Sequence, residues 1–316
     1  MIAHPPRGLL ADLVTPLGGK GTLDTKSLEN LIGVLSRHVD GFLAGSLEVG
    51  EGLSLDRSVR LGVLRAVLQM LPEGKSLFFD VTGRSPIETA DLIREATRLL
   101  GTGPGPADVF FLMTPLTFHG NRDLPNAVRD LCLLSRRRFV LANDPYLVGR
   151  LRTRLRHHNI RTAVLKKMAA NEQVAGLAHA GELSRVMNYQ RALKNRTGFR
   201  FYDWDEGNFL ERPSSSGLIS AGANLAPRQW AEIVGTSLNL FDAHRLYPDH
   251  LSRLWQSGQM VRSLMELYAT DAPAGLKFAL RIMGVISDDR TADSALEMSP
   301  AAKKNLEEKL TVLGLY

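Results

Sequence analysis

A pair of lysines closes a short apolar run near the middle of the chain. Lys166 and Lys167 follow Thr-Ala-Val-Leu at residues 162–165, a run short and apolar enough to form a buried strand. Inside a dry cavity, loss of water lowers a lysine pKa, and the neutral amine can attack a carbonyl carbon to form an imine. Alternate strand residues face opposite ways, so an inward Lys166 leaves Lys167 outside. The alternative is that the pair begins a solvated loop.

A second group of reactive side chains ends a later apolar run. Tyr202 and Asp203 close the run at residues 199–203, and three more carboxylates follow by residue 211. Tyrosine and aspartate can move protons, and barrel enzymes place such groups where strands end. An active-site role and a plain acidic loop are both consistent with this spacing.

The sequence contains no clear signature for a cofactor or a metal. No G-x-G-x-x-G run follows an apolar strand and opens a helix, so a dinucleotide cofactor is not expected. The run Gly-Gly-Lys-Gly-Thr at residues 18–22 lacks the spacing of a phosphate-binding loop. His157 and His158 are adjacent, so on a helix they point in different directions, and no second ligand cluster lies nearby. We therefore expect neither a cofactor nor a metal.

The elements that position these residues alternate between strand and helix. Short apolar runs are followed by longer stretches with helical spacing, some of them beginning at capping residues such as Asp24 and Ser85. Eight such runs match a closed (β/α)8 barrel, or TIM barrel, whose active sites lie at the carboxyl ends of the strands. The predicted strands are 9–14, 41–45, 76–81, 108–113, 139–143, 162–166, 199–203 and 217–222, and predicted helices include 24–39, 54–71, 85–100 and 171–193.

Strand signals stop near residue 227, and helical spacing continues to the end of the sequence. We therefore expect the barrel over residues 1–227 and a helical bundle packed on it over residues 228–316. Hydrophobic residues make up 44% and charged residues 23% of the chain, which is the composition of a globular protein with a large core.

The single cysteine, together with an N-terminal apolar stretch too short for a secretory signal, favours a cytoplasmic protein. The single cysteine, Cys132, excludes an intrachain disulfide and is expected to be a buried, inert thiol. No window approaches the ~20 apolar residues of a membrane helix, so no membrane partner is expected. The net charge is +6, but the basic residues are dispersed, so nucleic acid is not an expected partner either. The positive charge favours anionic carboxylate substrates.

Four runs occur in a characteristic order along the chain. Residues 15–17 read Thr-Pro-Leu, residues 45–48 read Gly-Ser-Leu-Glu, residues 142–149 read Ala-Asn-Asp-Pro-Tyr-Leu-Val-Gly, and residues 217–227 read Gly-Leu-Ile-Ser-Ala-Gly-Ala-Asn-Leu-Ala-Pro. Together with a lysine at the end of the sixth predicted strand, this set resembles the dihydrodipicolinate synthase and N-acetylneuraminate lyase family of Schiff-base aldolases. The resemblance spans nearly the whole chain and implies the same barrel with a C-terminal helical extension.

The resemblance assigns roles to individual residues. Lys166 matches the lysine of the family's G-[IV]-K, which forms an imine with the keto carbon of pyruvate. Ser46 and Leu47 match the two threonines of G-T-T-G-E, and a leucine cannot relay a proton. Ile219 matches the position whose backbone lines the pyruvate site.

The family's fifth-strand motif, Y-N-x-P-x-R-x-G, is only partly kept. Three positions match, namely Asn143, Pro145 and Gly149. The catalytic tyrosine is Ala142, and the arginine that grips a carboxylate is Leu147. Protons would then come from bound water or from one of three side chains, Tyr146, Tyr202 and Asp203.

The resemblance therefore implies a lyase or aldolase that acts on pyruvate or another 2-oxo acid through Lys166, without true dihydrodipicolinate synthesis. The alternative is a catalytically inactive barrel that binds a small molecule or a protein, since fold does not determine function. Relatives commonly form dimers or tetramers, so a homo-oligomer is also implied. The expected substrate-binding residues are Ser46, Leu47, Asn143, Tyr146, Tyr202, Asp203 and Ile219.

Overall fold

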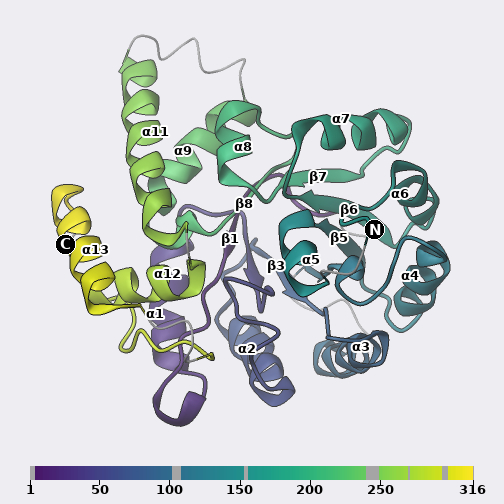
Figure 1. Ribbon diagram of the computed structural model, residues 1–316, viewed down its shortest axis with the longest axis horizontal. Coiled ribbons are helices and arrows are strands. Elements are labelled where there is room, and N and C mark those ends of the chain that lie inside the picture. Colours follow the sequence, from purple (N-terminus) through teal and green to yellow (C-terminus); the bar gives the residue numbers. More distant parts are fainter. Residues whose placement is uncertain are drawn as a thin grey trace. The chain divides into compact units, whose positions relative to one another are not determined.

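The computed structural model describes residues 4–101, 108–152, 156–239, 249–269, 271–293 and 298–315. Its parallel strands follow one another in chain order into a closed eight-stranded barrel, with helices between them (Figure 1). Further helices follow the last strand, so the predicted TIM barrel with a C-terminal helical extension is confirmed. The strands are β1 (Gly8–Asp12), β2 (Gly41–Ala44), β3 (Ser76–Asp80), β4 (Val109–Met113), β5 (Phe139–Asn143), β6 (Val174–His179), β7 (Arg200–Asp203) and β8 (Gly217–Ser220).

Internal contacts divide the chain into two compact units. The first consists of Met1–Arg7 and Ser76–Ile219, and the second of Gly8–Lys75 and Ser220–Tyr316. The predicted boundary at residue 227 falls within the second unit and remains a prediction.

The first unit contains β3 to β7, most of β8, and the helices between these strands. The helices are α3 (Pro86–Leu100), α4 (Leu124–Cys132), α5 (Pro145–Leu151), α6 (Thr162–Met168), α7 (Leu183–Ala192) and α8 (Glu206–Glu211). The second unit contains β1, β2 and the remaining helices. These are α1 (Thr25–Leu35), α2 (Arg57–Met70), α9 (Pro227–Leu238), α11 (Asp249–Tyr268), α12 (Ala272–Ile282) and α13 (Pro300–Val312).

Capping side chains explain where two of these helices begin. The Asp24 side chain accepts a hydrogen bond from the backbone N–H three residues further on, at the start of α1. Ser85 does the same at the start of α3. Each cap satisfies a backbone donor that the helix itself leaves without a partner, so both predicted helix starts are confirmed.

One predicted strand is wrong. Residues 162–166 lie in helix α6, and the sixth strand is β6, which falls inside the predicted helix 171–193. The β6 sequence Val-Ala-Gly-Leu-Ala-His has a single β-branched residue, and alanine is a strong helix former, so local propensity misleads here. Pairing with β5 on one side and β7 on the other overrides that propensity.

Two further features bear on the class of protein. Cys132 is buried at the end of α4, and burial raises the pKa of its thiol to about 12. Such a thiol is inert at neutral pH, as predicted. Within the described parts of the chain, we find no helix with the length and apolar character needed to span a membrane.

Candidate functional site

Two aromatic rings show which strand residues of the first unit face the barrel interior. The ring centroids of Phe78 on β3 and Tyr202 on β7 lie 5.9 Å apart, edge to face, although three strands separate β3 from β7 in the sheet. Such a contact can form only across the interior. Phe110 on β4 is in register with Phe78 and 5.2 Å from it, so it faces inward too. Since side chains alternate along a strand, every second residue shares this face.

The interior row that contains Tyr202 also contains two alanines. Ala142 of β5, Ala178 of β6 and Tyr202 are register partners on neighbouring strands, and all three are fully buried. The Tyr202 hydroxyl donates a hydrogen bond to the backbone carbonyl of Pro6. One large side chain beside two small ones is a common way to fill a small barrel.

Lys166 does not lie in this interior, so its predicted placement on a strand inside the barrel is wrong. It is exposed on α6, whose buried positions are Leu165 and Met168. The physical reason is the helical period, which turns Lys166 and its neighbour Lys167 to the solvent side of an amphipathic helix.

The actual sixth strand contains no lysine. It ends Gly176-Leu177-Ala178-His179, so the pattern G-[IV]-K meets an alanine at its third position. None of the eight strands contains a lysine. The side chain that faces the interior at this place is the methyl group of Ala178.

Asn143 faces away from the interior, because its neighbour Ala142 faces inward, and it holds the segment before α6. Its Oδ1 accepts a hydrogen bond from the Ile160 backbone N–H at 2.7 Å, and its Nδ2 donates to Asn159 Oδ1 at 2.9 Å. The Tyr189 hydroxyl, on α7, donates to the Ile160 carbonyl at 2.5 Å. Any substrate contact of Asn143 would therefore lie on the outer face of the strands.

His179 lies on the same outer face, at the end of β6. Its Nδ1 is 3.1 Å from Nδ2 of Asn143, and its Nε2 is 3.2 Å from the Glu182 carbonyl. The amide can only donate and the carbonyl can only accept, so these contacts select the neutral ring with its proton on Nε2. Burial lowers the pKa of His179, in agreement with a neutral ring. The sequence analysis missed this residue because it placed residues 171–193 in a helix.

Asp203 is the register partner of His179 and faces outward with it. Its Oδ2 accepts a hydrogen bond from the Ser214 N–H at 2.8 Å, and its own N–H donates to Ser214 Oγ at 3.2 Å. Burial raises the pKa of Asp203 to about 7, and the charge of Asp205 adds to the rise. Asp205 caps α8 by accepting from the Asn208 N–H at 2.9 Å. These hydrogen bonds join the carboxylates to the protein's own backbone, which agrees with the interpretation of residues 203–211 as an acidic loop.

The remaining predicted residues of the first unit lie in different surroundings. Tyr146 is 63% exposed near the start of α5. Ile219 is buried on β8, and its neighbour Leu218 is the register partner of the outward-facing Asp203, so Ile219 faces the interior. The structure therefore brings Tyr202 and Ile219 to one face and places Asp203 on the other.

A buried carboxylate that the sequence analysis missed faces the same interior. Asp80 lies two residues beyond Phe78 on β3, and its Oδ1 accepts hydrogen bonds from the Thr82 N–H at 2.8 Å and from the Thr82 hydroxyl. Thr82 Oγ1 in turn accepts from the Thr114 N–H at 2.9 Å. All of these side chains are buried. A carboxylate at this place can accept a proton, which is one part of general acid–base chemistry.

In the second unit, Ser46 and Leu47 follow β2 and are both buried. The Ser46 hydroxyl accepts a hydrogen bond from the Gly50 N–H at 2.8 Å, and the Thr15 hydroxyl donates to the Gly50 carbonyl at 2.9 Å. The Ser46 hydroxyl thus helps to fold its own loop, and its contact with a substrate remains a prediction.

A buried ion pair follows this loop. Lys277 on α12 donates to Glu51 Oε2, and the two side chains are 0% and 2% exposed. The Lys277 ammonium also donates to the Arg290 carbonyl at 2.8 Å, and Glu51 Oε1 accepts from the Ala292 N–H at 2.6 Å. Burial raises the pKa of Glu51 and lowers that of Lys277, and the charge of each partner opposes the shift of the other. Because 226 residues separate the partners, no local spacing could reveal the pair.

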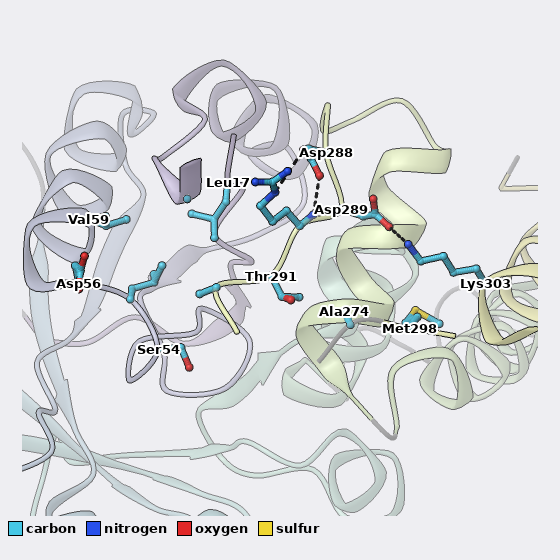
Figure 2. Close-up of a pocket in the computed structure, with 14 residues that line it drawn as sticks. Leu17, Ser54, Asp56, Val59, Ala274, Asp288, Asp289, Thr291, Met298 and Lys303 are labelled. Atoms are coloured by element: carbon cyan, nitrogen blue, oxygen red, sulfur yellow. Dashed lines mark hydrogen bonds and ion pairs between the residues drawn. The ribbon is translucent and has the colours of Figure 1, made fainter. Parts of the chain in front are cut away.

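The second unit also contains a pocket of about 660 Å³, shown in Figure 2. Its walls come from the segment after β1, the start of α2, the start of α12 and residues 288–292. Among the described residues, no group of three or more histidine, cysteine or acidic side chains could hold a metal ion.

Comparison with known proteins finds relatives along nearly the whole chain. No protein-family model matches it. The chain is 23% identical, over an alignment of 324 residues, to the 4-hydroxy-tetrahydrodipicolinate synthase of Buchnera aphidicola subsp. Cinara cedri, with 98% of this chain and 97% of the relative covered.

Solved structures agree with this result. The dihydrodipicolinate synthase of Thermotoga maritima matches with a TM-score of 0.81 at 20% identity, covering 99% of this chain and 100% of that chain. A prophage protein of the dihydrodipicolinic acid synthase family from E. coli K12, in complex with pyruvate, gives a TM-score of 0.79 at 19% identity, covering 98% and 99%. The structural likeness establishes the fold. The resemblance read from the motifs is confirmed, and this chain is a divergent relative of the dihydrodipicolinate synthases.

Proposed function

We propose that this chain is a small-molecule-binding relative of the dihydrodipicolinate synthases that does not use lysine imine chemistry. The observation that carries the proposal is the interior row of Ala142, Ala178 and Tyr202. This row contains no amine, and the only ionisable group in it, the Tyr202 phenol, is hydrogen-bonded to Pro6.

The chemistry of the reaction explains why this row matters. An imine needs a nucleophilic amine at the carbonyl carbon, and a tyrosine that moves protons contributes about 10²–10⁴-fold in rate. The family's tyrosine position is Ala142, and the lysine position at the end of the sixth strand is Ala178. Neither methyl group can attack a carbonyl or transfer a proton, and the ring of Tyr202 occupies space beside them.

A lyase acting on a 2-oxo acid such as pyruvate is the second candidate, and the sequence relatives favour it. One structural neighbour is a complex with pyruvate, and Asp80 offers a buried carboxylate on the interior face. This candidate requires an electron sink other than a strand lysine, or a lysine that reaches the substrate from outside the strands.

Borohydride trapping separates the two candidates. The full chain is incubated with pyruvate, with 2-oxobutanoate or with glyoxylate, treated with sodium borohydride and digested for peptide mass spectrometry. We expect no stoichiometric adduct on any lysine, because an exposed lysine gives no stable, desolvated imine and the buried Lys277 is paired with Glu51. A stoichiometric adduct on one lysine would overturn the proposal in favour of the lyase. A relative that retains the G-[IV]-K lysine serves as the positive control.

A gain-of-function variant shows whether the interior accepts a 2-oxo acid. Ala178→Lys restores an amine at the end of β6, and Ala178→Lys combined with Tyr202→Ala also removes the ring next to it. We expect trapping of pyruvate in the double variant and little in the single variant, because Tyr202 fills the adjoining space. Equal trapping in both would show that Tyr202 does not limit access.

The remaining expectations are part of the same proposal. We propose a cytoplasmic protein that forms a homo-oligomer of two or four copies and binds neither nucleic acid nor membranes. Light scattering on the purified full chain measures the mass of the assembly, and a monomer at micromolar concentration would contradict the oligomer.

A further inference from the structure

Three arginines lie where the parallel strands of the first unit begin. Arg138 directly precedes β5, Arg200 is the first residue of β7, and Arg196 lies in the loop before β7. The strand between them, β6, is parallel to both β5 and β7, so these strands begin at the same edge of the sheet. Barrel enzymes place their active sites at the opposite edge. The arginines therefore belong to neither the interior row nor the residues at the strands' carboxyl ends.

The N-terminal segment of the first unit joins two of these arginines. Arg138 Nη1 donates a hydrogen bond to His4 Nδ1 at 3.0 Å. Arg200 Nε donates to the carbonyl of Pro5, the next residue, at 2.9 Å. Two guanidinium groups are thus held by consecutive residues of one short segment.

Arg196 adds a third positive charge close to the other two. Burial lowers the pKa of Arg138, the charge of Arg196 lowers it further, and the charge of Glu172 opposes the shift. Arg196 Nε donates to the Ala169 carbonyl at 3.1 Å, and Arg138 Nη2 donates to the Glu172 carbonyl at 3.1 Å. Three guanidinium groups against one carboxylate leave an excess of positive charge at this edge.

Arg196 and Arg200 retain donors that a ligand can use. Each donates through Nε to a backbone carbonyl, and within the described part of the chain neither forms an ion pair with a carboxylate. Both side chains are partly exposed, and the two terminal nitrogens of each remain for a ligand. A planar guanidinium group can bind two oxygens of an anion at once.

His4 supplies a further donor in a fixed position. Arginine can only donate, so His4 Nδ1 accepts from Arg138 and the neutral ring carries its proton on Nε2. Gly198 has a φ of +74°, and a Cβ atom at this position would lie 2.6 Å from His4 Cε1. A larger residue would push the ring aside, so Gly198 allows His4 to lie here. His4 is exposed, so its N–H can meet a ligand from solvent.

We infer that this edge of the first unit binds a small phosphate-bearing anion, held by Arg196, Arg200 and the His4 N–H. A phosphate group carries about two negative charges at neutral pH and has several acceptor oxygens, so two guanidinium groups can bind it together. A bound anion also relieves the repulsion among the three arginines. The inference goes beyond the proposed function and does not depend on it, because the two sites share no residue.

Calorimetry with three anions tests the ligand class. The full chain is titrated with glycerol 3-phosphate, inorganic phosphate and acetate, each as the sodium salt at one constant ionic strength. We expect both phosphates to bind at least about tenfold more tightly than acetate, because only they can engage two guanidinium groups fully. Equal affinity for acetate, or no phosphate binding up to about 10 mM, would overturn the inference.

Matched variants locate the site. Arg196→Gln and Arg200→Gln each remove one guanidinium group and should weaken the binding of inorganic phosphate by about tenfold, whereas Arg200→Lys keeps the charge and should lose less. Arg65→Gln makes the same charge change at an exposed position of α2 in the second unit and should change nothing. Circular dichroism checks that each variant is folded. An equal loss in Arg65→Gln would mean that net charge, and not this cluster, attracts the anion.

Competition distinguishes a small anion from a macromolecule with the same phosphate chemistry. A short DNA duplex and phosphatidylglycerol vesicles are each added at the phosphate concentration used for glycerol 3-phosphate. We expect neither to displace glycerol 3-phosphate, because the cluster surrounds two consecutive residues and offers no extended line of cations. Displacement by either would overturn the small-anion class.

Discussion

Ala178 and Tyr202 are register partners on β6 and β7, and both face the barrel interior. The Tyr202 ring packs against Phe78 on the far strand β3, and its hydroxyl binds the carbonyl of Pro6. One side chain therefore links β7, β3 and the N-terminal segment of the first unit. A lysine in place of Ala178 would extend into the space next to this ring, so the Tyr202 side chain limits the room that is left there.

Substitutions of Tyr202 distinguish its ring from its hydroxyl. Tyr202→Ala leaves a cavity in a packed barrel interior and should lower the free energy of unfolding by about 3–5 kcal/mol. Tyr202→Phe keeps the ring but leaves the Pro6 carbonyl without this donor, and should lower it by about 1 kcal/mol. Urea unfolding followed by circular dichroism measures both. Equal losses would mean that the hydroxyl, and not the packing of the ring, dominates.

Two lysines provide a matched test of burial. Lys277→Met leaves the Glu51 carboxylate buried without its partner and should lower the free energy of unfolding by about 3–5 kcal/mol. Lys166→Met changes an exposed helix position, where lysine and methionine have similar helix propensity, and should stay within about 0.5 kcal/mol of the parent. Denaturant unfolding measures both values. A large loss in Lys166→Met would contradict the exposed placement of this lysine on α6.

The double variant Glu51→Gln/Lys277→Met tests the reason for the loss. It removes both charges, so it should be more stable than Lys277→Met alone, because the penalty of a lone buried charge disappears. If the double variant were less stable than the single one, the remaining partner of Glu51, the Ala292 N–H, would stabilise the carboxylate by more than its burial costs, and a lone buried charge would not explain the loss.

The strands that the sequence predicted well are those with strong local signals. The run at residues 139–143 matches β5 residue for residue, because aromatic and β-branched residues precede an Asp-Pro pair that begins the next helix. The run at residues 174–179 was missed because alanine and glycine dominate it, and only its two neighbouring strands make it β. This one error assigned the sixth strand to residues 162–166 and so placed the predicted catalytic lysine at Lys166, although β6 itself contains no lysine.

The residues of the candidate site were harder to predict from the sequence, because their arrangement depends on contacts that form only when the sheet closes. The sequence correctly placed Ile219 on the eighth strand, and its part in a substrate site remains a prediction. The pairing of Glu51 with Lys277 and the contact of Phe78 with Tyr202 join segments far apart in the chain. No spacing rule covers such pairs, since they follow from register and barrel closure and not from local periodicity.

We expect Asn143 to stabilise the fold through its hydrogen bonds more than to bind a substrate. Asn143→Ala removes the acceptor for the Ile160 N–H and the donor to Asn159, and leaves His179 Nδ1 without its partner. Buried groups left without partners cost about 1–3 kcal/mol each, so we expect a loss of roughly 3 kcal/mol in the free energy of unfolding. The measurement is urea unfolding, with the exposed Asn126→Ala on α4 as the control, for which little change is expected.

Asp203 should make stability depend on pH. Its pKa is raised to about 7 from an ordinary value of 3.8, so between these values the folded chain holds the proton more tightly than the unfolded chain. The stabilisation from this proton is present at low pH and is lost as the pH rises through about 7. From pH 5 to pH 8 the contribution of Asp203 to the free energy of unfolding should fall by on the order of 2 kcal/mol.

Asp203→Asn isolates this contribution, because it keeps an oxygen that can accept from the Ser214 N–H but removes the titrating group. Urea unfolding of the parent and the variant at pH 5 and pH 8 gives four free energies, and the difference of differences reports Asp203 alone. We expect the parent to lose more stability than the variant over this interval. Parallel pH profiles would mean that the folded carboxyl titrates near its ordinary value, so that water reaches Asp203 despite its burial in the structure.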